Sequence, residues 1–347
     1  MIVIDGATVR RLLPMADAVD LMRDTFRRYS AGRVVQPVRH MVRSPTGEVL
    51  AVMPAHVAAP DPRGSAAQHD PGVAAESYAG YGLKTVLIKP DNAARGLPVH
   101  VGLVLIFDPE TGLPAALIDA AALTAIRTAA ASAAATDALA RPDAAVLALL
   151  GAGVQARSHL RAIGAVRPVK EVRVWNHRPA SARALADWAR DQLDLDVTIA
   201  DTVPAAVADA DVICTVTAAC EPVLTAASVA AGAHINAVGS SFAHRRELAG
   251  DLVGRCAVFV DSHESARAEA GDLLLAAREG HFRIEAVRAE VGEVLRGDHP
   301  GRSSVEEITL FKSLGLAAQD VVAGFAVYQR AALTDAGERV EMRGDGS

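Results

Sequence analysis

The sequence predicts an α/β fold of two domains, one of them built on a parallel sheet. The chain has 347 residues, which is long enough for two domains of roughly 100–200 residues each. From residue 144 onward, short apolar segments alternate with helical stretches. This alternation is typical of parallel strands joined by crossover helices.

The first part of the chain contains one amphipathic helix and several strands. Residues 14–30 carry apolar side chains at a helical spacing and are followed by Gly32, a residue type that often ends helices. Apolar segments predict strands at residues 49–53, 84–88, 101–107 and 114–118. Residues 58–79 are rich in Pro, Gly, Ala and Asp and predict a long loop, which is either a lid or disordered.

The alternating region begins after an alanine-rich helix. Residues 119–139 predict this helix, in which Arg127 is the conspicuous charge, and Pro142 ends it. Strands are expected at residues 146–150, 171–175, 197–199, 212–216, 233–238 and 257–260, with helices after the first two. A last helix over residues 316–333 precedes a polar tail, residues 335–347, which we expect to be frayed.

Composition narrows the classes of function. The 35 Lys and Arg residues are outnumbered by 41 Asp and Glu residues, and the pI is about 6.0. Because nucleic acids and anionic membranes are bound through clustered basic side chains, we expect neither as a partner. We find no signal-peptide pattern and no apolar run long enough to span a membrane. Cys214, Cys220 and Cys256 have no paired spacing, so we expect reduced cysteines, a cytoplasmic protein and no metal site.

A glycine-rich turn lies between the first strand of the alternating region and the helix after it. Gly151 permits a tight turn, Gly153 lets the backbone approach a pyrophosphate, and Ala156 occupies the position of helix–strand contact. Val154 and Gln155 begin the helix, whose N-terminus offers free N–H groups to an anion. This G-x-G-x-x-A pattern between a strand and a helix predicts a dinucleotide-binding domain.

The end of the next strand bears on the choice of nucleotide. NAD-binding folds usually have Asp or Glu there, because a carboxylate accepts hydrogen bonds from the ribose hydroxyls and repels a 2′-phosphate. Here the strand is followed by Asn176, His177 and Arg178. These neutral and basic side chains favour NADPH as the cofactor. NADH is the alternative, and a plain solvated turn is the other interpretation of the basic pair.

Several motifs taken together resemble those of the ornithine cyclodeaminase/mu-crystallin family. They are residues 150–156 (LGAGVQA), 216–224 (VTAACEPVL), 232–239 (GAHINAVG), 246–248 (REL), 270–273 (AGDL) and 309–315 (TLFKSLG). The resemblance implies a Rossmann domain, residues 123–309, inserted in an α+β substrate-binding and dimerisation domain formed by residues 1–122 and 310–347. It also implies a homodimer. The GAHINAVG motif is most similar to the mu-crystallin branch, which implies NADPH-dependent ketimine reduction.

The resemblance assigns a carboxylate-binding cluster to the first domain. Arg39, Lys84 and Arg127 match basic positions that bind the substrate carboxylate, and an Arg can do so through two parallel hydrogen bonds. Lys84 can also donate a proton, since burial lowers the pKa of a lysine. His100 matches a family histidine expected to face the pocket, and Thr128 matches a contact to the cofactor phosphate. For each basic residue taken alone, a structural salt bridge is the alternative.

Further cofactor contacts are expected at strand ends of the Rossmann domain, because open α/β sheets bind their ligands there. These strand-end residues are Thr215, Thr217, Val238, Gly239 and Ser240. The resemblance adds Ser313, Leu314 and Gly315 as the segment that closes over the nicotinamide. Asp272 is either a family feature or a helix-capping aspartate.

Two positions depart from the ornithine cyclodeaminases. These enzymes carry an aspartate in the loop after the Ala-Val-Gly strand, where Ser241 stands here, and a glutamate before the Met-Pro pair, where Ala51 stands. With both carboxylates absent, cyclisation of ornithine is not expected. The sequence therefore predicts an NAD(P)H-dependent reductase of the C=N bond of a small α-imino acid, reversible with amino-acid dehydrogenation.

Four alternatives to this function stay open at the level of the sequence. Three are enzymes of the same family: a cyclodeaminase working without those carboxylates, an alanine-type dehydrogenase, and an N-substituted amino acid synthase. The fourth is a non-catalytic protein that binds a dinucleotide or a small carboxylate.

Overall fold

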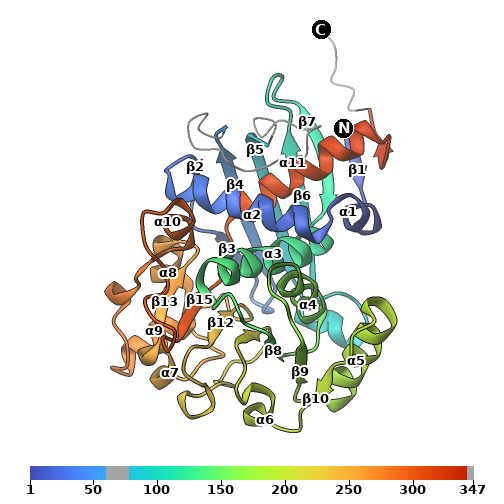
Figure 1. The fold of residues 1–347 in the computed structure, drawn as a ribbon. Coiled ribbons are helices and arrows are strands. Elements are labelled where there is room, and N and C mark those ends of the chain that lie inside the picture. Colours follow the sequence, from blue (N-terminus) through green and yellow to red (C-terminus); the bar gives the residue numbers. More distant parts are fainter. Residues whose placement is uncertain (60–77, 342–347) are drawn as a thin grey trace. The chain divides into compact units, whose positions relative to one another are not determined.

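The computed structural model describes residues 1–59 and 78–341 (Figure 1). The chain has the expected α/β fold and divides into two compact units, unit 1 with residues 1–127 and 316–347, and unit 2 with residues 128–315. Both boundaries lie a few residues beyond those expected at 122/123 and 309/310. The second lies later because strand β15 (Thr309–Lys312) pairs with two strands of unit 2.

Unit 1 contains an eight-stranded mixed sheet. Its order is β16 (Glu338–Arg339), β1 (Ile2–Ile4), β7 (Pro114–Asp119), β6 (His100–Phe107), β5 (Gly80–Ile88), β4 (Val49–Val57) and β2 (Val34–Val35), while β3 (His40–Arg43) also pairs with β4. Strands β1 and β7 run parallel, and the other pairs are antiparallel.

Strands β4 and β5 are longer than the sequence predicts. They pair along their whole length, from Val49 opposite Ile88 to Val57 opposite Gly80. The expected strands at residues 49–53 and 84–88 stop early because Pro54, His56, Gly80 and Gly82 are poor strand formers by local pattern. Cross-strand hydrogen bonds outweigh that local preference.

Helix α11 (Ala317–Leu333) packs against one face of this sheet, with α2 (Met15–Ser30) beside it (Figure 1). Side chains of β5 alternate, so that Gly82 and Lys84 lie on the buried face and Tyr81 on the exposed one. A Cβ atom at Gly82 would lie 2.7 Å from Val321 Cγ2, so glycine lets helix α11 approach the sheet closely. Helix α1 (Gly6–Leu12) and the 3-10 turn η2 (Pro90–Arg95) complete the unit.

The start of the C-terminal tail is ordered, which corrects the expectation of a frayed segment from residue 335. Glu338 and Arg339 pair with Val3 and Ile2, and the backbone N–H of Val340 donates to the carbonyl of Met1 at 2.9 Å. These bonds join the two ends of the chain, a contact that no local pattern reveals. Residues 342–347 lie outside the described part of the chain.

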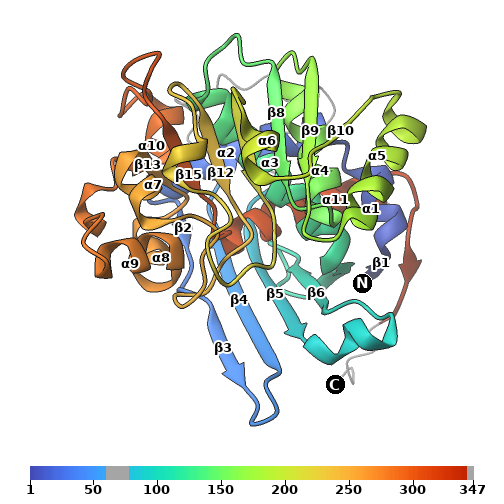
Figure 2. The same ribbon diagram turned by 90° about the horizontal axis from the view of Figure 1, so that it is seen from below.

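Unit 2 contains an eight-stranded sheet whose neighbouring strands all run parallel, as predicted (Figure 2). Its order is β10 (Thr198–Ile199), β9 (Glu171–Trp175), β8 (Val146–Leu150), β11 (Val212–Thr215), β12 (His234–Ala237), β15, β13 (Ala257–Val260) and β14 (Ala289–Glu290). The chain places β9 and β10 on one side of β8 and the later strands on the other. The order therefore reverses between β8 and β11, where open α/β sheets bind ligands at their carboxyl ends.

Helices of unit 2 follow the strands as the alternation predicts. Helix α4 (Val154–Val166) follows β8 and helix α5 (Pro179–Leu193) follows β9. Shorter segments, not foreseen because they are too short for a periodic signal, are α6 (Val203–Val207), α7 (Gly250–Arg255), α8 (His263–Glu269), α9 (Gly271–Arg278), α10 (Val291–Arg296), η3 (Ala226–Ser228) and η4 (Ile284–Ala286). The alanine-rich helix α3 (Ala120–Leu139) is buried along most of its length, so its small side chains permit close packing.

Three further expectations meet the structure here. Residues 60–77 of the predicted loop at 58–79 lie outside the described residues. Within the described ranges, no helix combines the length and the apolar character needed to cross a bilayer. The cysteines Cys214, Cys220 and Cys256 are free thiols, as expected.

Candidate active site

Unit 1 holds a buried group of two cations that share one carboxylate oxygen. Lys84, in the middle of β5, lies with its Nζ atom 3.1 Å from Asp320 Oδ1, and Arg127 Nε of α3 lies 3.0 Å from the same oxygen. The Lys84 side chain is 4% exposed and that of Asp320 is 0% exposed. Two cations can be buried this deeply only where an anion compensates them, and Asp320 on helix α11 supplies it.

The neighbouring residue on α11 holds the guanidinium of Arg127 from a second side. Arg127 Nη1 donates to Gln319 Oε1 at 2.8 Å, and the same oxygen accepts the backbone N–H of Leu316 at the start of the helix. Among the described residues, Asp320 Oδ2 and Gln319 Nε2 are buried without a hydrogen-bond partner. One free acceptor and one free donor thus remain in the group, enough to hold a further polar ligand or water. Neither Asp320 nor Gln319 could be singled out from the sequence, because neither belongs to a charged pattern.

Burial sets the charge behaviour of Lys84. Removal from water, together with the charges of Arg127 and Arg39, lowers the pKa of this lysine to about 8, while Asp320 opposes the change. An ammonium group with a pKa near neutrality is mostly charged at pH 7 and can give up its proton without a large cost.

The other two candidates from the first half of the sequence belong to the same unit. Arg39 lies half-buried between β2 and β3, close enough to Lys84 for its charge to act there. His100 is the first residue of β6, opposite Ile88 in the register. Burial and the nearby charge of Lys84 lower the pKa of His100. Arg39 and His100 therefore both lie near Lys84, and His100, with its lowered pKa, adds no positive charge at neutral pH.

In unit 2, the glycine turn after β8 has the geometry that a dinucleotide needs. Gly151 has φ +116°, and a Cβ atom there would lie 2.6 Å from the carbonyl oxygen of Val216, so the protein itself requires glycine. Gly153 is the N-cap residue of α4 with φ −89°, and a Cβ there would meet no atom within 4 Å. No described residue demands glycine at position 153, so the open space fits an incoming pyrophosphate.

Two other predicted cofactor residues, Val154 and Gln155, directly follow this turn. Val154, the first residue of α4, is 68% exposed, and the Oε1 atom of Gln155 is buried without a partner among the described residues. Thr128 lies buried on α3, directly after Arg127. These groups leave apolar surface and a hydrogen-bond acceptor at the start of α4.

The segment between β9 and α5 carries the predicted phosphate-binding residues. Asn176 Nδ2 donates to the carbonyl of Arg178 at 3.1 Å, which closes a tight turn. His177 and Arg178 are exposed, and their side chains have no hydrogen-bond or ion-pair partner within the described ranges. Two basic side chains at this strand end are therefore available to an anion.

Residues at the ends of β11 and β12 donate hydrogen bonds to a buried acid, Glu247, which is not among the predicted site residues. The hydroxyls of Thr215 and Thr217 donate to Glu247 at 2.8 and 2.7 Å. The backbone N–H of Gly239 donates to the same carboxylate at 2.7 Å. Ser240 is buried and its hydroxyl donates to the carbonyl of Arg245, while Val238 just before it is half-buried.

The segment after β15 is held by another unforeseen acid. Asp261 Oδ2 accepts the backbone N–H groups of Leu314 and Gly315 at 2.7 and 2.6 Å. Gly315 has φ +84° and Ser313 is buried. The three residues Ser313, Leu314 and Gly315 thus form a turn that is rigidly tied to the end of β13.

Asp272 does not cap a helix, which corrects one of the two interpretations above. Its Oδ1 accepts the backbone N–H groups of Glu247 and Leu248 at 2.7 and 2.9 Å, and its Oδ2 forms an ion pair with Lys312 at 2.8 Å. Asp272 therefore links distant segments of the chain instead of capping the N-terminus of its own helix α9.

Comparison with known proteins places this geometry in a family. The sequence model of the ornithine cyclodeaminase/mu-crystallin family matches residues 70–335. A Delta(1)-pyrroline-2-carboxylate reductase of Bacillus cereus is 33% identical over 99% of this chain and 100% of its own length. The ketimine reductase mu-crystallin of Mus musculus is 39% identical over 86% of this chain and 85% of its own.

The chain belongs to the ornithine cyclodeaminase/mu-crystallin family. Solved structures agree. That of the Thermococcus litoralis Delta(1)-pyrroline-2-carboxylate reductase, in complex with NADH and L-proline, has a TM-score of 0.90, 30% identity and coverage of 98% of this chain and 100% of its own. An archaeal alanine dehydrogenase dimer with bound NAD has a TM-score of 0.87, 31% identity and coverage of 99% of both chains.

Ala51 and Ser241, the two positions that depart from the cyclodeaminases, lie in β4 and after β12. Ala51 is buried in β4 on the same face as Met53, which pairs with Lys84 in the register. Ser241 follows the end of β12 and is half-buried. Neither position offers a carboxylate.

Replacing Gly153 by alanine should separate ligand binding from folding. Because a Cβ at this position meets no protein atom, the melting temperature should stay unchanged, while steric exclusion of the pyrophosphate should weaken NAD(P)H binding about tenfold or more. Fluorescence titration of the reduced nucleotide measures this. The matched control is Gly164→Ala in the same helix, where a Cβ is equally unobstructed and nucleotide affinity should not change. Unchanged affinity in the Gly153→Ala variant would contradict the assignment of the turn.

Proposed function

We propose that the chain reduces the C=N bond of a small α-imino acid, with a pyridine nucleotide as the hydride donor. The observation that carries the proposal is the buried lysine beside Arg127 and Asp320, in a family member whose second unit has an open glycine turn for a dinucleotide. The relatives named for pyrroline-2-carboxylate and ketimine reduction support the same reaction. In reverse, the reaction is the dehydrogenation of an amino acid.

The charge balance of unit 1 suits a carboxylate substrate. Lys84 and Arg127 are two cations bonded to a single anion, Asp320, and the charge of Arg39 also acts on Lys84. An excess of positive charge remains, and a substrate carboxylate would neutralise part of it. Arg127 is oriented by Asp320 and Gln319, so little side-chain entropy is lost when it binds the carboxylate.

Lys84 is the proposed proton donor. A bound reduced nicotinamide would supply the hydride for the imine carbon, and the imine nitrogen would need a proton from the protein. The ammonium of Lys84, with a pKa near 8, can donate that proton and become a neutral amine, while its bond to Asp320 keeps the nitrogen atom in place. Solvent restores the proton after product release.

The residues at positions 51 and 241 disfavour ammonia elimination from ornithine. That reaction requires a carboxylate near the side-chain amine, and Ala51 and Ser241 provide none. A substrate without a second amine, such as a cyclic imino acid, fits this lack of negative charge.

Replacing Lys84 by methionine should lower kcat/KM for pyrroline-2-carboxylate and piperideine-2-carboxylate about a hundredfold or more, because the proton donor is lost. Nucleotide oxidation followed at 340 nm checks this. The matched control is Lys89→Met, one residue beyond the end of the same strand, where the lysine is partly exposed and paired with Glu48; activity should persist.

The pH profile supplies the second arm of this experiment. Lys84 acts in its protonated form, so kcat/KM should be highest below the lysine pKa and fall as the pH rises through about 8. Asp320→Asn removes the charge that raises this pKa and should move the fall to lower pH. Full activity of Lys84→Met, or a profile unaffected by Asp320→Asn, would contradict the role of Lys84. Proline and ammonia formed from ornithine at an enzymatic rate would contradict the reaction itself.

We propose NADPH as the preferred nucleotide, supported by the exposed pair His177 and Arg178 after β9. Replacing Asn176 by Asp should shift preference toward NADH, because a carboxylate binds ribose hydroxyls and repels a 2′-phosphate.

Replacing Arg178 by Ala should weaken NADPH binding about tenfold and leave NADH binding unchanged, since only NADPH carries the 2′-phosphate with which Arg178 would pair. Titration with both nucleotides measures this, with exposed Arg183→Ala on α5 as the control. Tighter binding of NADH by the unmodified protein would overturn the proposal.

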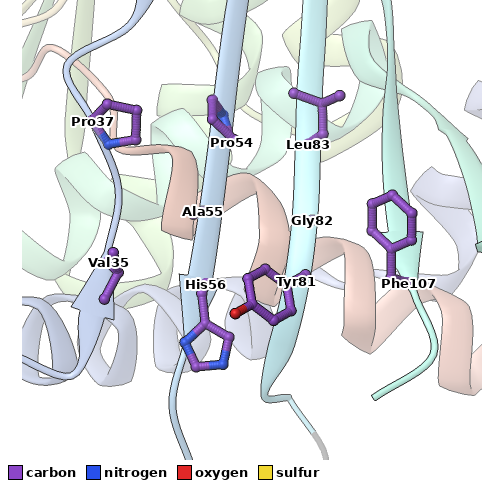
Figure 3. A pocket seen from close by; sticks show the side chains of 9 residues that line it. All are labelled: Val35, Pro37, Pro54, Ala55, His56, Tyr81, Gly82, Leu83 and Phe107. Atoms are coloured by element: carbon purple, nitrogen blue, oxygen red, sulfur yellow. The ribbon is translucent and has the colours of Figure 1, made fainter. Parts of the chain in front are cut away.

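We also propose that the chain is a homodimer joined through unit 1. The face of the sheet away from α11 exposes large apolar side chains, among them Tyr81, Val42 and Leu103. A groove of about 380 Å³ lies on strands β4 to β6. Tyr81 and Phe107 are among the side chains that line it (Figure 3). An apolar face of this kind is rarely left in contact with water. The archaeal alanine dehydrogenase of similar fold is a dimer, which supports a dimeric state.

Tyr81→Glu should convert this dimer into a monomer, because a charge cannot be buried unpaired in an apolar interface. Sedimentation should give twice the chain mass of 36.1 kDa for the unmodified protein and one chain mass for the variant. Val305→Glu in unit 2, where the side chain is equally exposed, should remain dimeric. A monomeric unmodified protein would refute the assembly.

A further inference from the structure

Three of the family motifs meet in one buried ionic cluster of unit 2 that the proposed reaction does not use. REL contributes Glu247, AGDL contributes Asp272, and TLFKSLG contributes Lys312. All three side chains are completely buried. The cluster lies behind the carboxyl ends of β11, β12 and β15, and β15 lies directly beside β12 in the sheet (Figure 2).

The carboxylate of Glu247 joins two strand ends. Its Oε1 accepts the backbone N–H and the hydroxyl of Thr217, both at 2.7 Å. Its Oε2 accepts the hydroxyl of Thr215 at 2.8 Å and the backbone N–H of Gly239 at 2.7 Å. Four donors from the ends of β11 and β12 therefore converge on one side chain.

Only a carboxylate satisfies this set of donors. Each oxygen of Glu247 receives one backbone N–H group, which cannot turn away as a hydroxyl can. A glutamine would direct its NH₂ group at one of the two, whichever way its amide is oriented. Position 239 also requires glycine, because a Cβ atom there would lie 2.4 Å from Glu247 Oε1.

Asp272 binds the backbone of Glu247 and is itself paired with Lys312. Asp272 accepts the backbone N–H of Glu247, and its ion pair with Lys312 lies at 2.8 Å. Lys312 Nζ donates to the carbonyl of Ser240 at 2.6 Å, directly after Gly239. Burial and the charge of Asp272 raise the pKa of Glu247, whereas Lys312 and the bonds from Thr217 lower it. The cluster thus ties the segment after β12 to β15 as well as to β11.

The position of the cluster identifies which part of a nucleotide it serves. In a sheet of this topology, the half containing β8 to β10 binds the adenosine side, and the other half binds the second mononucleotide. The segments after β11 and β12 belong to the second half.

We propose that Glu247, supported by Asp272 and Lys312, is a positioning residue that shapes the nicotinamide half of the nucleotide site by holding the segments after β11 and β12 together. This inference rests on the proposed use of a pyridine nucleotide. It assigns Thr215 and Thr217 an indirect role, through Glu247, in place of a direct contact with the cofactor.

The test compares the intact nucleotide with a fragment that lacks nicotinamide. Calorimetric titration of the purified protein with NADPH and with 2′-phospho-ADP-ribose gives two affinities for each variant. Glu247→Gln should weaken NADPH binding about tenfold, the effect of losing one hydrogen bond to a charged group, and leave fragment binding within about twofold. Thr217→Val, which removes one of the four donors, should act in the same direction with a smaller effect. It also keeps the test decisive if Glu247→Gln does not fold.

The matched control is Glu279→Gln. Glu279 binds Arg246, the neighbour of Glu247, in a partly exposed ion pair at 2.7 Å, so both affinities should stay unchanged. Equal weakening of both ligands, or no weakening of either, in the Glu247 and Thr217 variants would overturn the inference. Failure of the unmodified protein to bind either ligand would instead overturn the proposed use of the nucleotide.

Discussion

The carboxylate of Asp320 is the constraint on which unit 1 depends. One of its oxygens accepts from both Lys84 and Arg127, and the three groups lie where water does not reach. Without the anion, two buried like charges would repel each other and lose their hydration. With the anion present, Lys84 keeps a charged ammonium group whose pKa of about 8 lies close to neutral pH. Arg127 is held in one orientation by its bonds to Asp320 and Gln319. A cluster fixed in this way before any ligand arrives is what the proposed binding of an anionic substrate requires.

Unit 2 uses buried charge in a comparable way, although for the backbone. Glu247 gathers the ends of two parallel strands, and Asp261 gathers the turn after a third. Strand ends in an open sheet have backbone N–H groups without partners in the ladder, and a buried carboxylate is a strong acceptor for them. The surfaces left to a ligand are therefore backbone edges and small residues such as Gly153.

Local features of this chain could be predicted from the sequence. The turn at Gly151, the strand before it and the helix after it depend on neighbouring residues, and each was found where expected. Arg127 stood out because a charge in an alanine-rich helix needs a partner. The length of β4 and β5, the ordered end at Glu338 and the part played by Asp272 could not be predicted in this way, because each depends on a segment distant in the chain.

The sequence by itself determined the fold class, the glycine turn and the basic residues that form the candidate site. These follow from periodicity, backbone conformation and residue type, which are short-range properties. The tertiary structure alone decided that Asp320 is the partner of Lys84, 236 residues earlier in the chain, and that Glu247 occupies the hydroxyls of Thr215 and Thr217. The physical reason is that folding decides which neighbours come within hydrogen-bond distance. These neighbours set the charge state of a buried group and the hydrogen-bonding capacity that a polar side chain has left for a ligand.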